Sequence, residues 1–171
     1  MNTSDSEKLI CTHCDHPVTS SDEFCPECGS LFVDGRKCSI HPKSDAEGVC
    51  VICGKLFCAK CGKEFLHKFL CNVHGGYEII EGYARVFGTL DDTAAQYAKS
   101  CLEKAGMHPM LFSKMQPKGG PRFLKTLWAP NGGYIGHAVT EIKVMVPCHE
   151  VLRAEKTLRQ LKVLRNVRQP A

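Results

Sequence analysis

The sequence predicts small metal-stabilised modules followed by an α+β domain. Twelve of the 171 residues are cysteines, and ten of them precede residue 72. Residues 1–74 hold few large apolar side chains, so this segment cannot bury enough surface to offset the entropy of ordering it. Residues 75–171 instead show periodic apolar patterns and contain only two cysteines. We therefore expect metal ions to stabilise the front of the chain and an ordinary apolar core to stabilise the rest.

The cysteines are expected to be reduced thiols. The N-terminus MNTSDSEKLI is polar and acidic and lacks the apolar stretch of a signal peptide. No apolar run approaches the roughly 20 residues that span a bilayer. We therefore expect a cytoplasmic protein without a membrane span. In that compartment paired cysteines usually bind metal rather than form disulfides.

Charge is distributed unevenly along the chain. The formal net charge is +4, yet residues 1–74 carry eight Lys and Arg against ten Asp and Glu, and residues 75–171 carry fourteen against eight. Metal ligation requires thiolates, so ten thiolates and three Zn²⁺ ions would lower the net charge by about four. Residues 1–37 alone carry three basic against seven acidic residues. This front would repel phosphates, which disfavours nucleic acid as a partner.

The first predicted module spans residues 9–33. CTHC is followed after ten residues by CPECG, and these motifs supply four candidate ligands: Cys11, Cys14, Cys25 and Cys28. Two C-x-x-C turns joined by a short loop close a Cys₄ site, which favours structural zinc and leaves a rubredoxin-like iron site as the alternative. Gly29 is expected to adopt a positive φ behind the second turn. His13 and His16 are expected to face solvent. The segment resembles the short zinc ribbons of many bacterial proteins.

The second predicted module spans residues 36–75. It contains four pairs of metal-type ligands, each with two residues between its members: Cys38/His41, Cys50/Cys53, Cys58/Cys61 and Cys71/His74. Eight ligands can hold two tetrahedral ions. Spacing alone permits three pairings and does not choose among them.

The full pattern C-x2-H-x8-C-x2-C-x4-C-x2-C-x9-C-x2-H, with GKLFCAKC in its middle, resembles the B-box zinc finger. The best-known B-boxes end in two histidines, whereas this chain ends the module with Cys71 and His74. The resemblance implies an interleaved cross-brace, with one zinc on Cys38, His41, Cys58 and Cys61, and the other on Cys50, Cys53, Cys71 and His74. His67 is the competing ligand for the second ion, but Cys71-x2-His74 has the better spacing.

The sequence predicts three zinc ions in closed sites. Every candidate ligand is a protein side chain, so no coordination position is left for water, which argues against zinc catalysis. Apolar residues that flank the ligands are expected to form a small core in the second module: Val49, Val51, Ile52, Leu56 and Phe57. Four more are expected to lie along one short helix: Phe65, Leu66, Phe69 and Leu70.

The third predicted module, residues 77–165, is the α+β domain. Strands are expected at 83–89, 108–114 and 139–147, with a further possible strand at 123–130. Helices are expected at 90–106, capped by Asp91 or Asp92 and ended by Gly106, and at 148–167. This order argues for helices on one side of a sheet. The glycine-rich loop from 115 to 137 is expected to be a plain hairpin connection.

The third module resembles a small prokaryotic domain described as a putative signal-transducing protein, a ferredoxin-like relative of the PII regulators. The likeness rests on the first strand, on AQYAKSCLEKAGMHPML, and on IKVMVP before the last helix. It implies an α+β ferredoxin-like fold and a regulatory or binding role, with a partner or a small-molecule ligand.

No catalytic grouping stands out in the sequence. Cys148 follows Pro147 at a helix start, where a thiol pKa can fall, but a half-buried structural residue is the favoured interpretation, as it is for Cys101. The basic tail at 151–171 is interpreted as a solvated helix face. We therefore expect a non-enzymatic adaptor or regulatory protein that binds protein partners. A nucleic-acid-binding zinc protein is the first alternative, and a ubiquitin-ligase-like factor, disfavoured by the lack of a RING motif, is the second.

Overall fold

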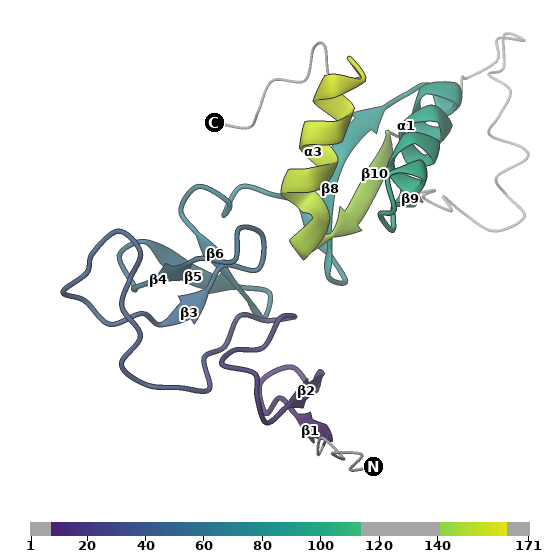
Figure 1. Ribbon diagram of the computed structural model, residues 1–171. Coiled ribbons are helices and arrows are strands. Elements are labelled where there is room, and N and C mark those ends of the chain that lie inside the picture. Colours follow the sequence, from purple (N-terminus) through teal and green to yellow (C-terminus); the bar gives the residue numbers. More distant parts are fainter. Residues whose placement is uncertain (1–7, 114–140, 164–171) are drawn as a thin grey trace, which may run out of the picture. The chain divides into compact units, whose positions relative to one another are not determined.

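The computed structural model describes residues 8–113 and 141–163 (Figure 1). Within these ranges the chain divides into two compact units. Unit 1 holds the described residues up to Ala84 together with Pro147–Arg153. Unit 2 holds the described residues of 85–146 and those from Ala154 onward.

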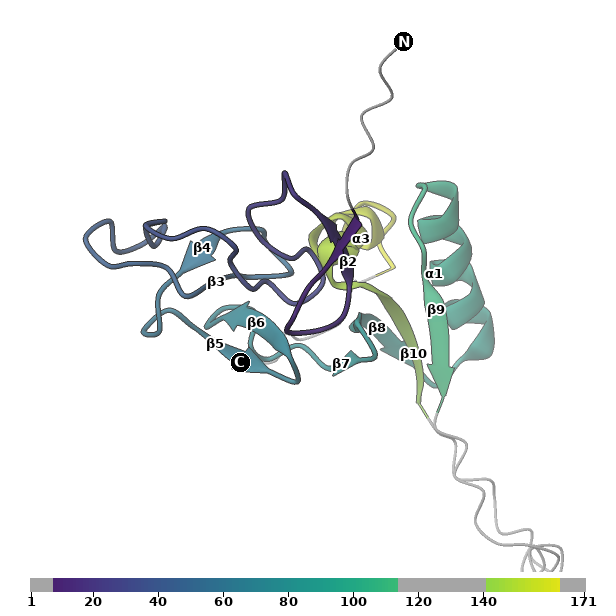
Figure 2. The same cartoon turned by 90° about the horizontal axis from the view of Figure 1, so that it is seen from below.

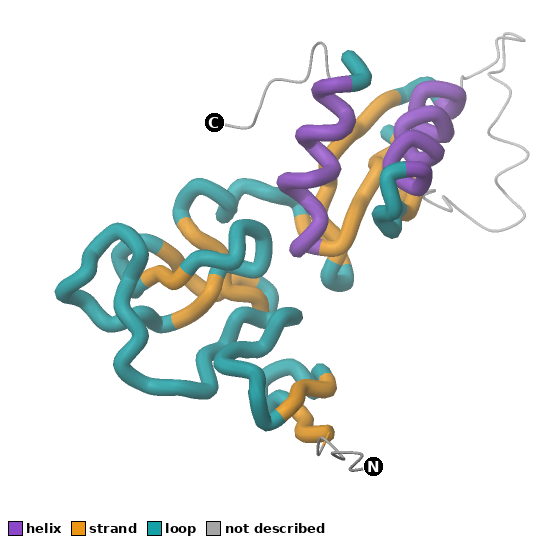
Figure 3. The backbone as a smooth tube through the Cα atoms, viewed as in Figure 1, coloured by secondary structure: helices purple, strands orange, loops and turns teal. Residues whose placement is uncertain are grey.

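Unit 1 is built mainly from loops and turns around short strands (Figure 3). The strands form three antiparallel two-stranded sheets, and their bounds are β1 Lys8–Ile10 with β2 Pro17–Thr19, β3 Gly48–Val49 with β4 Leu56–Phe57, and β5 Gly62–Phe65 with β6 Lys68–Cys71. Strands this short cannot form a stable sheet by themselves. Their turns carry the metal-type ligands, so ligation is what would hold them.

The expected short helix near residue 65 is wrong, because Phe65, Leu66, Phe69 and Leu70 belong to the β5–β6 hairpin. Leu66 and His67 form its two-residue turn with φ values of 48° and 58°. Such a turn reverses the chain where the helical spacing of the apolar residues would have continued it. A helix of about seven residues is marginal in water, whereas the hairpin lets Phe69 pack over Gly48 and Gly62.

Backbone hydrogen bonds join the first predicted module to the second. The Val49 N–H donates to the Gly29 carbonyl at 2.8 Å, and the Phe69 N–H donates to the Cys28 carbonyl at 2.8 Å. Gly29 has a φ of 82°, as expected, and a Cβ there would lie 2.1 Å from the Val49 carbonyl oxygen. Only glycine fits at this approach. The two modules are therefore packed together within unit 1.

A buried lysine reinforces this junction. The Lys68 side chain on β6 is 9 % exposed, and its ammonium donates to the Glu27 carbonyl oxygen at 2.9 Å and pairs with the Glu27 carboxylate. A buried charge persists only when it is paired and hydrogen-bonded, as it is here.

The segment Pro147–Arg153 also belongs to unit 1, although it lies far along the chain. Its Cys148 N–H donates to the Gly82 carbonyl at 3.2 Å.

The remaining strands form a four-stranded sheet in the order β7-β8-β10-β9, and their bounds are β7 Ile79–Ile80, β8 Tyr83–Thr89, β9 Met110–Ser113 and β10 Ile142–Pro147. The strand expected at 83–89 is confirmed residue for residue, and those expected near 108–114 and 139–147 are confirmed with shorter bounds. Strands β8, β10 and β9 lie side by side in both views (Figures 1 and 2).

Two helices cover one face of this sheet (Figures 1 and 3). Helix α1 spans Asp92–Lys104 and helix α3 spans Val151–Gln160 after a short 3₁₀ turn, η1, at Cys148–Glu150. The unit 2 core is apolar, and its fully buried side chains include Leu102, Val144, Met145 and Leu158. A mixed α/β arrangement therefore follows the metal-type clusters, as the sequence predicted.

The ends of the helices follow from local chemistry. The Asp91 side chain accepts a hydrogen bond from the Thr93 N–H at 2.8 Å and caps α1. Gly106, with a φ of 71°, ends the turn that follows the helix. Helix α3 ends at Gln160, earlier than expected, and Lys162 has a φ of 60°.

The loop expected at 115–137, the possible strand at 123–130 and the end of the basic tail lie outside the described residues. Within the described ranges, no helix combines the length and apolar character that crossing a bilayer requires.

Candidate metal centres

Site 1 gathers four cysteines from two consecutive turns, and its members are Cys11, Cys14, Cys25 and Cys28. Each C-x-x-C closes with a backbone bond, from the Asp15 N–H to the Cys11 carbonyl at 2.9 Å and from the Gly29 N–H to the Cys25 carbonyl at 2.8 Å. Asp15 and Gly29 both have positive φ. This conformation curls the chain so that both sulfurs of a turn face the same point.

Sites 2 and 3 interleave along the chain. Site 2 comprises Cys38, His41, Cys58 and Cys61, and site 3 comprises Cys50, Cys53, Cys71 and His74. Spacing left three pairings open, and the structure brings together the sets that the B-box resemblance implied. The hairpin between Cys61 and Cys71 separates them: Gly62 pairs with Cys71 in register, so the two cysteines project into different sites from one end of the same sheet.

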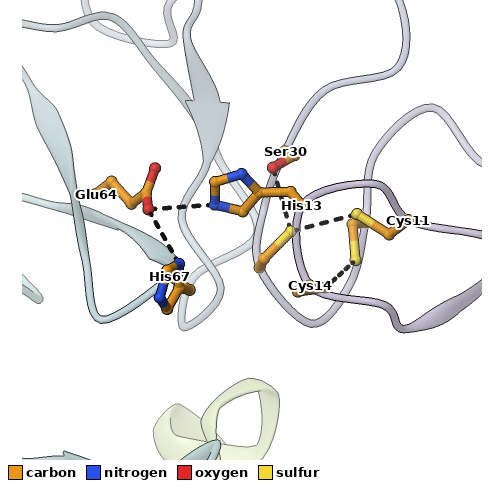
Figure 4. Close-up of polar contacts among 8 residues, drawn as sticks. Cys11, His13, Cys14, Ser30, Glu64 and His67 are labelled. Carbon is orange, nitrogen blue, oxygen red and sulfur yellow. Dashed lines mark hydrogen bonds and ion pairs between the residues drawn. The ribbon is translucent and has the colours of Figure 1, made fainter.

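The spacing of the sulfurs in site 1 fits a tetrahedral ion. Zn–S bonds of about 2.3 Å place two sulfurs roughly 3.8 Å apart. The Sγ atoms of Cys11 and Cys28 are 3.8 Å apart, and those of Cys14 and Cys25 are 3.5 Å apart. The Ser30 hydroxyl lies 3.2 Å from the Cys28 sulfur, where it can donate to a thiolate (Figure 4).

In sites 2 and 3 the distances from the histidine nitrogen to the sulfurs also fit a tetrahedral ion. Zn–N bonds of about 2.0–2.1 Å place a ligand nitrogen roughly 3.5 Å from each sulfur. In site 2 the His41 Nδ1 lies 3.9, 3.5 and 3.2 Å from the sulfurs of Cys38, Cys58 and Cys61. In site 3 the His74 Nδ1 lies 3.5 Å from Cys50 and 3.2 Å from Cys71. The donor sets and distances of all three groups can hold zinc; that zinc occupies them stays a prediction.

The thiols within a group differ in acidity. Burial opposes ionisation of Cys11, but backbone hydrogen bonds from His13 and Cys14 outweigh it and lower its pKa from 9.0 to about 7. For Cys38, burial is likewise outweighed by backbone hydrogen bonds, from Cys58 among others, and its pKa falls to about 6.

Other thiols in these groups have raised pKa values. Burial and the thiols of Cys58 and Cys38 raise the pKa of Cys61 to about 11. Burial and the neighbouring Cys50 raise the pKa of Cys53 to about 12. Crowded sulfurs thus resist becoming thiolates together, and a divalent cation at their centre removes that repulsion.

Three histidines discussed from sequence lie outside the three groups. His67, the competing ligand, is at the hairpin tip and belongs neither to site 2 nor to site 3. His13 is exposed, as expected, and its Nε2 also lies 3.2 Å from the Glu64 carboxylate. His16 is half-buried beside site 1, and its carbonyl accepts a hydrogen bond from the Cys11 N–H at 2.9 Å.

Cys148 is buried and poorly suited to nucleophilic chemistry. Burial raises its pKa to about 11, although the nearby Lys68 ammonium opposes the rise. The expected effect of a helix start is therefore outweighed. Cys101 is half-buried on α1 and, like Cys148, belongs to none of the metal-type groups of the described chain.

Comparison with protein-family models, with curated proteins and with solved structures finds no match for this chain. The geometry of the three sites is therefore the basis for assigning a function. Sequence reasoning missed the contact between the first module and the β5–β6 hairpin, because hydrogen bonds between distant backbone segments leave no local signal.

Proposed function

We propose that this chain is a non-catalytic zinc-binding adaptor whose ions are structural. This proposal is supported mainly by the donor sets, because each of the three groups offers four protein donors. Together the groups contain ten cysteine sulfurs and two imidazole nitrogens. A tetrahedral ion so surrounded has no position for substrate or water, which is typical of structural and not of catalytic zinc. The chain would then act through its surface.

Exposed apolar side chains on unit 1 support a role in protein binding. Ile40 is 60 % exposed and Val73 is 81 % exposed. Each directly precedes the histidine of a C-x-x-H pair, so the ligated turn would hold the side chain outward on a rigid support. Others on unit 1 include Leu9, Ile10, Phe24, Phe32, Val33, Phe65 and Leu66. Apolar groups on a rigid surface are typical of sites that bind other proteins.

The finer assignments belong to the same proposal. The paired turns of site 1 support a zinc ribbon, and the interleaving of sites 2 and 3 supports a B-box-like cross-brace. The order β8-β10-β9 with helices after β8 and β10 supports a ferredoxin-like regulatory domain that binds a partner or a small ligand. Fold likeness alone does not assign function.

Nucleic acid is the less favoured partner. Unit 1 would become more acidic once its thiolates bind zinc, and several of its basic groups are paired with carboxylates, as Arg36 is with Glu23 and Lys37 with Asp45. These pairs reduce the positive field that phosphate binding requires.

The test compares capture of proteins from native-cell extract by the full chain and by an Ile40→Ser/Val73→Ser variant. Leu90→Ser is the matched control, because Leu90 is 63 % exposed and lies in unit 2. We expect a defined set of proteins to bind the wild type and the control but not the double variant, with zinc content equal in all three. Equal capture by the double variant, or a gel shift with random-sequence RNA or DNA at about 0.15 M salt, would count against the adaptor function.

A further inference from the structure

Three side chains outside sites 1 to 3 converge at the junction of the two modules. They are His13 from the first C-x-x-C turn, Glu64 from β5 and His67 from the β5–β6 turn. The His13 Nε2 lies 3.2 Å from the Glu64 Oε1, and the His67 Nδ1 lies 3.8 Å from the same oxygen. The three donor atoms all lie within 4.8 Å of one another (Figure 4).

We propose that His13, Glu64 and His67 form a fourth metal site, open to solvent, for a borderline divalent transition ion such as Zn²⁺, Ni²⁺ or Cu²⁺. Two imidazoles and one carboxylate suit such ions, whereas Ca²⁺ and Mg²⁺ prefer oxygen ligands alone. Three protein donors from the described part of the chain converge here, so water completes the coordination. In this respect the site differs in kind from the three closed groups.

The distances suit coordination. Bonds of about 2.0–2.2 Å to nitrogen and oxygen place neighbouring donors roughly 3.0–3.4 Å apart in octahedral or tetrahedral geometry. The separation of His13 from Glu64 already fits, and the 3.8 Å between His67 Nδ1 and Glu64 Oε1 exceeds this range by only a few tenths of an ångström. The two imidazole rings meet edge to face with centroids 5.9 Å apart and an interplanar angle of 63°, so they approach from different directions instead of stacking.

The backbone holds the donors in place. His13 lies between Cys11 and Cys14, whose turn is closed by the Asp15 N–H. Glu64 is paired in register with Phe69 on β6. The Phe69 N–H bonds to the Cys28 carbonyl, so the strand that supports Glu64 is fixed to the module that carries His13.

The hairpin turn presents His67 at a conformational cost. Leu66 and His67 both adopt left-handed φ, where Asn-Gly is the favoured pair, and non-glycine residues cost roughly 1–2 kcal/mol each. Leu66 is 62 % exposed and the His67 side chain is 80 % exposed, so packing of these two side chains does not repay that cost. A ligand role for His67 accounts for an otherwise unfavourable turn residue.

The test is nickel uptake by the full chain after sites 1 to 3 are loaded with zinc. We expect one Ni²⁺ per chain in equilibrium dialysis while the three zinc ions are retained. The paramagnetic ion should broaden the imidazole NMR signals of His13 and His67 and leave those of His41 and His74 much less affected.

Two variants test the ligands without disturbing the fold. His67→Asn keeps a side chain that tolerates the left-handed turn, and Glu64→Gln keeps the shape of the acid. Each should weaken nickel binding at least about tenfold with three zinc ions still bound. His149→Ala removes a histidine whose side chain is 72 % exposed and should bind nickel like the wild type.

Absence of a nickel ion on the wild-type chain would overturn the proposal, and so would equal uptake by His67→Asn. In either case the cluster is a hydrogen-bonded His–Glu contact only. Neither result would count against the proposed adaptor function, because that function depends on sites 1 to 3 and not on this cluster.

Discussion

The buried side chains of unit 1 include many cysteines beside apolar residues such as Val49 and Leu70, whereas those described in unit 2 are apolar and include no cysteine. The most deeply buried residues of unit 1 include Cys11, Cys25, Cys38 and Cys50, whereas those of unit 2 include Leu102, Val144, Met145 and Leu158. Buried thiols contribute little hydrophobic free energy compared with leucine or methionine, and crowding makes them resist ionisation together. This contrast predicts that metal binding stabilises unit 1 and that burial of apolar side chains stabilises unit 2.

Metal removal should produce the largest difference in stability between the two units. Structural zinc contributes roughly 10–16 kcal/mol per site in finger peptides, against about 5–15 kcal/mol for the net stability of a whole domain. We expect a strong chelator to unfold unit 1 and leave unit 2 folded. Hydrogen exchange read by segment measures this: amides of Gly29, Val49 and Gly54 should lose protection while those of α1 keep it. An equal loss of amide protection in α1 would show that unit 2 also depends on metal for its stability.

A single ligand change should break one site and spare its interleaved neighbour. Cys58→Ala removes a ligand from site 2 only, so zinc content after gel filtration should fall from three ions per chain to two. Imidazole NMR should show His41 released and His74 still bound. Cys101→Ala, which touches no group, should keep three ions. Release of His74 with His41 retained would overturn the interleaved pairing.

A cavity in the apolar core should act on unit 2 alone. Leu102 is fully buried on α1, so Leu102→Ala should lower the free energy of unfolding of unit 2 by about 2–5 kcal/mol. Denaturant unfolding followed by helix circular dichroism gives the value, and zinc content should stay at three. Leu161→Ala, at a position 46 % exposed, should change stability by less than about 0.5 kcal/mol. Loss of zinc from Leu102→Ala would show that the units do not gain stability separately.

The smallest effect tests the junction within unit 1. Gly29→Ala combines an unfavourable φ with a clash against the Val49 carbonyl, whereas Gly35→Ala has a similar φ of 75° and nothing within 4 Å of its new Cβ. The control should cost about 1 kcal/mol for the backbone conformation alone, and Gly29→Ala about 1–3 kcal/mol more. Thermal melts of the zinc-loaded chain measure the difference. Equal melting temperatures would mean that the clash is relieved by a small shift.

The parts predictable from sequence were those with a local signal. The helix at α1 was evident from Asp91, the apolar spacing and Gly106, and β8 from its apolar residues. The six C-x-x-C or C-x-x-H pairs were recognisable because both members of each pair lie within one turn. Their partners are distant in the chain, so the interleaving came from a resemblance and not from spacing.

The β5–β6 hairpin shows why the remaining structure could not be predicted from the sequence. Leu66 and His67 carry none of the glycine or asparagine that announces a two-residue turn, and the apolar residues around them happen to follow a helical spacing. What selects the hairpin is the packing of Phe69 over Gly48 and Gly62 and the bond to Cys28, all contacts between separate segments. The same hidden turn brought His67 to His13.

Unit 1 is completed by a segment made late. Its candidate ligands all lie between Cys11 and His74, but Pro147–Arg153, which also belongs to it, is synthesised about 70 residues later. At a translation rate of about 5–20 residues per second, roughly 4–15 s separate the two events. During that interval the nascent chain can take up its metal while the ribosome is still building unit 2. The order of synthesis therefore allows a metal ion to bind before the Cys148 N–H donates its hydrogen bond to the Gly82 carbonyl.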